Sequence, residues 1–165
     1  MSVHLAARRS LRLAFALALG ATAPACLEPT EAVLDISTNA ECSAVAGTGI
    51  TAGKDGEVEL ASFDTSTTQC QGQGDIGSIV LLPDGDNTGP FAFKVVTSLG
   101  TTAVESCVAP DYGPSCIVAR RSMHFVPNLP FHVPLKMSLA CAGVVCPDGQ
   151  TCAEGICVNS TIDCE

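Results

Sequence analysis

The chain has 165 residues, with 8 Lys and Arg against 17 Asp and Glu and a formal net charge of −9 at pH 7. A surface of this charge repels phosphate groups, so a nucleic-acid-binding function is not expected. The sequence holds ten cysteines and no tryptophan.

The first 25 residues predict a cleaved signal peptide. Three arginines at positions 8, 9 and 12 precede a short apolar run over residues 13–19, and small residues follow. This is the order of regions in an export signal, and the run is far shorter than the roughly 20 residues that span a bilayer. Its removal takes away three basic residues, which leaves 5 basic against 17 acidic residues and a net charge of −12.

The segment Ala23-Pro24-Ala25-Cys26 has two interpretations. A general signal peptidase would cut before Cys26 and release a secreted chain. Alternatively, the segment resembles the lipobox of bacterial lipoproteins, with Ala23 where that motif prefers Leu. The resemblance implies a lipid on Cys26, a membrane as partner, and, with Leu27 next, an outer-membrane location. Residues 26–30 then form a tether, and several acyl chains would hold the protein firmly on the membrane.

Exported cysteines meet an oxidising compartment, where disulfides persist. Neighbourhood in the sequence pairs Cys42 with Cys70 and Cys107 with Cys116. Ten cysteines allow five bridges, but a lipid on Cys26 leaves nine, so that one is unpaired. The expected odd cysteine is Cys164, one residue from the end of the sequence.

Residues 31–140 predict an all-β domain, an Ig-like antiparallel β-sandwich. Apolar residues alternate with polar ones or form short runs, which is typical of strands. Pro134 within one such pattern predicts an edge strand or a bulge, because proline cannot donate to the ladder. The segments concerned are residues 32–36, 57–60, 79–82, 91–96 and 131–139.

The turn over residues 84–89 resembles the start of an EF-hand calcium loop. Its twelfth position is Val95, where a calcium site needs a bidentate Glu. We therefore interpret it as a hairpin loop, and expect no metal and no cofactor.

Residues suited to catalysis are few. The mature chain has two histidines, His124 and His132, and no G-x-S-x-G or H-E-x-x-H motif. A nucleophile such as Ser78 or Ser122 is left open as a spatial partner. The paired cations Arg120-Arg121 are either an anion site or part of a solvated strand. The sequence favours a protein that is not an enzyme.

The tail, residues 141–165, contains the segment CAGVVCPDGQTCAEGICV. It has too few large apolar side chains for a core of its own, so bridges must stabilise it. Turns are expected at residues 147–149 and at 154–155. Crossed or nested bridges fit better than a zinc site in an oxidising compartment. The cysteines concerned are Cys141, Cys146, Cys152 and Cys157.

This cysteine spacing resembles the short EGF-like segments of exported bacterial proteins. The anchor cysteine, the strand-rich region and ARRSMHFVPNLPFHVPLKM before the tail together resemble bacterial envelope lipoproteins of unknown function. The resemblance implies location and architecture only. We expect a lipid-anchored, non-catalytic binding, adhesion or structural module with an unidentified protein or glycan ligand. The alternative is a secreted carbohydrate- or protein-binding module without lipid.

Overall fold

The computed structural model describes residues 27–85 and 89–162. The expected signal peptide over residues 1–25, the lipidation candidate Cys26 and the odd cysteine Cys164 lie outside the described residues. Within these two ranges, no helix is both long enough and apolar enough to cross a membrane.

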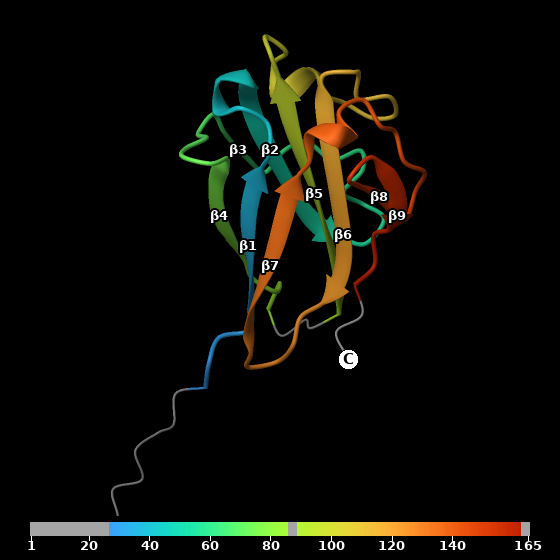
Figure 1. Cartoon of the computed structure of the whole chain (residues 1–165). Coiled ribbons are helices and arrows are strands. Elements are labelled where there is room, and N and C mark those ends of the chain that lie inside the picture. Colours follow the sequence, from blue (N-terminus) through green and yellow to red (C-terminus); the bar gives the residue numbers. More distant parts are fainter. Residues whose placement is uncertain (1–26, 86–88, 163–165) are drawn as a thin grey trace, which may run out of the picture.

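The described chain is all-β, as predicted, and its only helices there are three short 3₁₀ turns. Its elements form three sheets, with strand orders β4-β1-β7, β3-β2-β5-β6 and β8-β9 (Figure 1). The strands are β1 (Glu31–Thr38), β2 (Val45–Lys54), β3 (Thr65–Thr67), β4 (Asp75–Leu81), β5 (Pro90–Leu99), β6 (Cys116–His124), β7 (Pro130–Met137), β8 (Gln150–Ala153) and β9 (Ile156–Asn159); the 3₁₀ turns are η1 (Cys42–Ala44), η2 (Val104–Ser106) and η3 (Leu139–Cys141).

The two larger sheets pack face to face and share one apolar core. In β1, alternate side chains turn inward, and Ala32, Leu34 and Ile36 are at most 3% exposed. They meet the inward residues of β5, among them Phe93 and Val95. Alternation of this kind buries every second residue of a strand, so the period-two sequence pattern of β1 and β7 marks their core faces.

The expectation of purely antiparallel sheets is wrong for one pairing. Strands β1 and β7 run parallel, with Leu34 opposite Val133 and Asp35 opposite Pro134. Side chains alternate in the same way in parallel and antiparallel strands, so the sequence pattern does not carry the direction of pairing. Strand β7 is at the edge of its sheet, as Pro134 predicted.

Residues 57–60 are a second correction, because they form turns rather than a strand. Val58 is buried and Glu59 half-buried, but this two-residue alternation arises in a loop that covers the outer face of β5. Strand β2, in contrast, was not predicted. Its sequence VAGTGITAGK is rich in Gly and Thr, and only its pairing with β5 places it in the sheet.

Both faces of β5 are covered. Phe93 and Val95 face the main core, while Val96 and Lys94 face outward and are nevertheless no more than 3% exposed. A second apolar cluster covers this outer face and includes Val104, Tyr112 and Val118. Residues 100–115 fold back over the sheet and supply part of that cover. The burial of this outer face therefore results from tertiary packing.

The tail closes the side of the sandwich where β6 and β7 form the sheet edges. Strand β8 packs on β6, and Ser160 and Ile162 extend the sheet by hydrogen bonding to the main chain of Ser122. The buried Thr151 hydroxyl accepts a 3.0 Å hydrogen bond from the N–H of Arg120. These contacts satisfy groups at the β6 edge that would otherwise be open to another chain.

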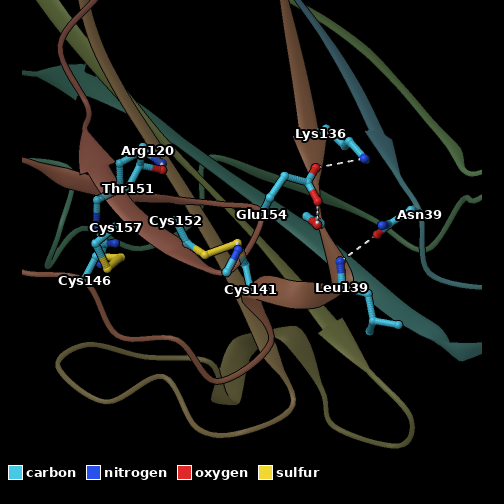
Figure 2. Close-up of a disulfide and its surroundings, with 12 residues drawn as sticks. Asn39, Arg120, Lys136, Leu139, Cys141, Cys146, Thr151, Cys152, Glu154 and Cys157 are labelled. Carbon is cyan, nitrogen blue, oxygen red and sulfur yellow. Dashed lines mark hydrogen bonds and ion pairs between the residues drawn. A yellow bond between two sulfur atoms is a disulfide. The ribbon is translucent and has the colours of Figure 1, made fainter.

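The tail also holds β7. Figure 2 shows Glu154 pointing from the β8–β9 turn to Lys136, with 2.9 Å between the carboxylate and the ammonium. The second oxygen of Glu154 accepts a hydrogen bond from Ser138. Cys141 and Cys152 belong to the same apolar cluster as the sandwich core. The turns expected at 147–149 and 154–155 are both present, and Glu154 and Gly155 have the positive φ values of a two-residue hairpin turn.

All eight cysteines in the described residues are bonded. Two bridges, Cys42–Cys70 and Cys107–Cys116, are the pairs that sequence neighbourhood suggested. The tail bridges cross: the first cysteine is bonded to the third and the second to the fourth. They are Cys141–Cys152 and Cys146–Cys157.

Candidate functional site

The candidate site lies on the outer face of the larger sheet, where two cations stand side by side. Lys94 of β5 is directly opposite Arg120 of β6 in the strand register. Both point away from the sandwich core because their neighbours Phe93 and Ala119 point into it. The loop over residues 55–64 covers them from above.

Glu59 of this loop accepts hydrogen bonds from both cations and forms an ion pair with Arg120. Its carboxylate accepts hydrogen bonds from Nε and Nη2 of Arg120, each at 2.7 Å, and from the Tyr112 hydroxyl at 2.7 Å. The Lys94 ammonium donates to the Glu59 main-chain carbonyl at 2.6 Å. A forked contact of guanidinium and carboxylate is among the strongest ion pairs available to a protein.

The Tyr112 ring completes the cluster. Cζ of Arg120 lies 5.3 Å from the ring centroid and Nζ of Lys94 lies 5.8 Å from it, so both cations interact with the ring. Tyr112 is the only tyrosine in the sequence and is 6% exposed. Its ring is therefore committed to the two cations and is not open to a ligand.

The pKa directions follow from this packing. The hydrogen bonds from Arg120 hold the pKa of the Glu59 carboxyl below its ordinary value, so Glu59 stays charged. Burial lowers the pKa of Lys94. Burial, followed by the hydrogen bond to Glu59, raises the pKa of Tyr112, so its hydroxyl stays protonated and continues to donate.

Two grooves flank Glu59. The larger, of about 700 Å³, lies between the 55–60 loop and the tail loop 145–149, with Arg120 and Ser122 in its floor. The smaller, of about 490 Å³, lies between residues 59–66 and 105–109, with Lys94 in its floor. Glu59 and Leu60 line both grooves, so the loop forms a ridge between them.

Exposed apolar side chains stand at the mouths of these grooves. Leu60 on the ridge is 88% exposed, Val108 of the smaller groove 61% and Val145 of the larger 52%. They come from three segments that are far apart in the sequence. Sequence reasoning missed Glu59 and Leu60 as site residues, since it assigned residues 57–60 to a strand.

Arg120 and Arg121 are adjacent on β6 but have different surroundings. Arg120 belongs to the cluster with Glu59, whereas alternation turns Arg121 to the other face of β6. The Arg121 guanidinium donates to the main-chain oxygen of Arg120 at 2.8 Å, and burial lowers its pKa. The two guanidinium groups therefore have different hydrogen-bond partners, although both residues line the larger groove described above.

Ser78 and His132 meet a common carboxylate on the outer face of the smaller sheet. The Ser78 hydroxyl donates to Asp35 at 2.6 Å, and Nδ1 of His132 lies 2.7 Å from the other Asp35 oxygen. In a catalytic triad the imidazole stands between nucleophile and acid. Here the carboxylate stands in the middle, and these hydrogen bonds hold the pKa of Asp35 low, so the group is a bridge between three strands.

Ser122 and His124 lie near the end of β6, with Ser122 buried and His124 exposed. No hydrogen bond joins them within the described residues. Across the same part of the chain, no group of three or more His, Cys, Asp or Glu side chains is placed to hold a metal ion. Residues 86–88 of the turn at 84–89, and with them the calcium interpretation, lie outside the described residues.

Comparison with known proteins gives no relative from which to assign the site. No family model matches the chain, and neither does a curated protein or a solved structure.

Proposed function

We propose that this chain is an exported, non-catalytic binding module of the cell envelope, anchored to a membrane by a lipid on Cys26. The observation that carries the binding function is the pair of grooves around Leu60. The cations in their floors all donate hydrogen bonds within the protein, while the apolar side chains at their mouths are exposed. Exposed apolar groups beside a concave surface are typical of an interaction site.

A binding function is favoured over catalysis because the reactive groups are already engaged. Glu59 accepts hydrogen bonds from Arg120 and Tyr112, which leaves it a poor base. Ser78 donates to a carboxylate rather than to an imidazole. A serine nucleophile needs an activating base, and the Asp35 carboxylate beside Ser78 is a weak one because its hydrogen bonds lower its pKa.

The membrane anchor is supported by the sequence before residue 27, whereas cysteine parity counts mildly against it, because a lipid on Cys26 leaves an odd number of cysteines. Four bridges use eight of the ten cysteines. The remaining two, Cys26 and Cys164, lie outside the described residues. A lipid on Cys26 accounts for the first and leaves the second as a thiol. The four bridges also fit an exported chain, because disulfides persist in oxidising compartments.

Fractionation and mass measurement test the anchor. Cells that produce the full chain are grown with and without globomycin, and the mature protein is located and weighed. We expect it in the membrane fraction with an acylated N-terminal Cys26, and an unprocessed precursor when globomycin is present. An unmodified chain in the medium would establish the secreted alternative instead.

A further inference from the structure

We infer that the two grooves together bind an extended protein segment in which basic side chains stand beside apolar ones. This inference rests on the binding function proposed above and names its ligand class. Its ligand would cross the Leu60 ridge, with one end in each groove.

The exposed apolar side chains at the mouths of the grooves indicate that the ligand carries apolar side chains. Leu60, Val108 and Val145 are each more than half exposed and stand on opposite sides of the grooves. An aliphatic or aromatic side chain that enters either groove would contact the ridge and one wall. Burial of one such side chain contributes about 1.5–3 kcal/mol, which is enough to orient a short segment.

The charges that a ligand can reach in the grooves indicate that the ligand also carries basic side chains. The cations that line the grooves are buried or half-buried, and Lys94 and Arg120 are held by Glu59. The carboxylates of Asp55, Asp148, Asp64 and Glu105 also line the grooves; all four residues are exposed, and none forms an ion pair within the described chain. A ligand therefore meets negative charge first, which favours a basic partner.

Other ligands fit these residues less well. A sugar ring is commonly bound by stacking on an exposed aromatic face, but the Tyr112 ring is covered by two cations. An anionic ligand would have to pass the exposed carboxylates of Asp55 and Asp148 to reach Arg120, and those of Asp64 and Glu105 to reach Lys94. A protein segment also offers main-chain hydrogen bonds, which the exposed loop residues on either side of the ridge can meet.

The test uses the protein expressed from the full chain and purified after processing, with its bridges intact. Three labelled 12-residue peptides serve as probes: alternating Leu and Lys, alternating Leu and Glu, and alternating Ser and Lys. Fluorescence anisotropy measures their affinities at low and high salt. We expect binding only of the Leu/Lys peptide, with an affinity that falls as salt rises.

Paired variants separate site binding from general attraction to an acidic protein. Leu60→Ser should weaken Leu/Lys binding about tenfold, which corresponds to about 1.4 kcal/mol. The double variant Asp55→Asn with Asp148→Asn should weaken it about fivefold at low salt and little at high salt. Leu129→Ser and Asp75→Asn, which also change exposed residues but outside both grooves, should leave it unchanged.

Equal losses in the groove variants and their controls would overturn the inference, as would equal binding of the Leu/Glu peptide. Absence of binding to any peptide would overturn it too. The anchor does not depend on these results, since membrane location and Cys26 acylation are measured separately. A chain that is acylated but binds no peptide would refute the ligand class alone.

Discussion

Arg120 and Glu59 are 61 residues apart in sequence and form a forked ion pair on the outer face of the larger sheet. Nε and Nη2 of the guanidinium each lie 2.7 Å from a different oxygen of the carboxylate. The side chains are 12% and 27% exposed. Because Glu59 sits on a loop and Arg120 on a strand, this pair fastens the ridge between the grooves to the sheet.

Replacing Glu59 with Gln should destabilise the protein by about 1–2 kcal/mol. The change leaves the Arg120 charge without its counter-ion, and the partial exposure of the pair keeps the loss below that of a fully buried one. Urea unfolding measures it. Glu154→Gln, which breaks an exposed pair of the tail, is the matched control and should cost less. An equal or larger effect of the control would contradict the role given to Glu59.

Stability should fall at acid pH through Glu59. Its pKa in the folded protein is below the ordinary value of 4.5. The carboxylate therefore stabilises the fold fully above that value, and this contribution is lost as pH falls through the folded-state pKa. Asp35 and Glu154 shift in the same direction. Unfolding of the wild type and of Glu59→Gln between pH 7 and pH 3 isolates Glu59. The variant should show the shallower decline, and parallel curves would contradict the assignment.

Gly49→Ala should destabilise the protein by about 1–3 kcal/mol. A Cβ at this position would lie 2.6 Å from Cγ of Phe63, whose ring packs on the glycine. Gly53→Ala in the same strand is the control, because its Cβ would lie 3.7 Å from the nearest atom, an ordinary contact. Thermal unfolding should show a clear loss for the first variant and almost none for the second. A neutral Gly49→Ala would mean that Phe63 moves aside freely.

Thr151→Val should cost about 1–3 kcal/mol although the two side chains have nearly the same shape. The hydroxyl of the buried Thr151 accepts a hydrogen bond from the N–H of the half-buried Arg120, and the variant leaves that donor unpaired against an apolar side chain. Hydrogen exchange at Arg120 should accelerate more than at neighbouring amides of β6. Thr161→Val at an exposed tail position is the control, and equal losses would argue against the tail as a closing element.

Non-reducing peptide mapping should recover the four bridges, including the crossed pair of the tail. With Cys26 acylated, alkylation of the unfolded, unreduced protein should label one thiol, at Cys164. Labelling of none would indicate that Cys26 and Cys164 are bonded, and labelling of both would remove the anchor. Cys26→Ser in the full chain is the control, since it abolishes acylation but should leave all four bridges in place.

Strands could be predicted from the sequence where one face of the strand is polar. In β1 and β7 the outer face is solvated, so alternation shows which residues enter the core. The same rule misled at residues 57–60, where Val58 and Glu59 alternate within a loop. It also missed β2, because Gly and Thr residues carry little of the pattern. The alternation of apolar and polar residues also does not show that β1 and β7 pair in parallel.

The amino-acid sequence by itself determined the net negative charge, the all-β class and the need for bridges in a tail without a core, and it predicted an export signal at residues 1–25. These depend on composition and local spacing, which are present before the chain folds. Only the tertiary structure decided the candidate site. Glu59, Leu60 and Arg120 lie on a loop and a strand that meet through packing, so the ion pair, the ridge and the grooves do not exist until the two segments are brought together.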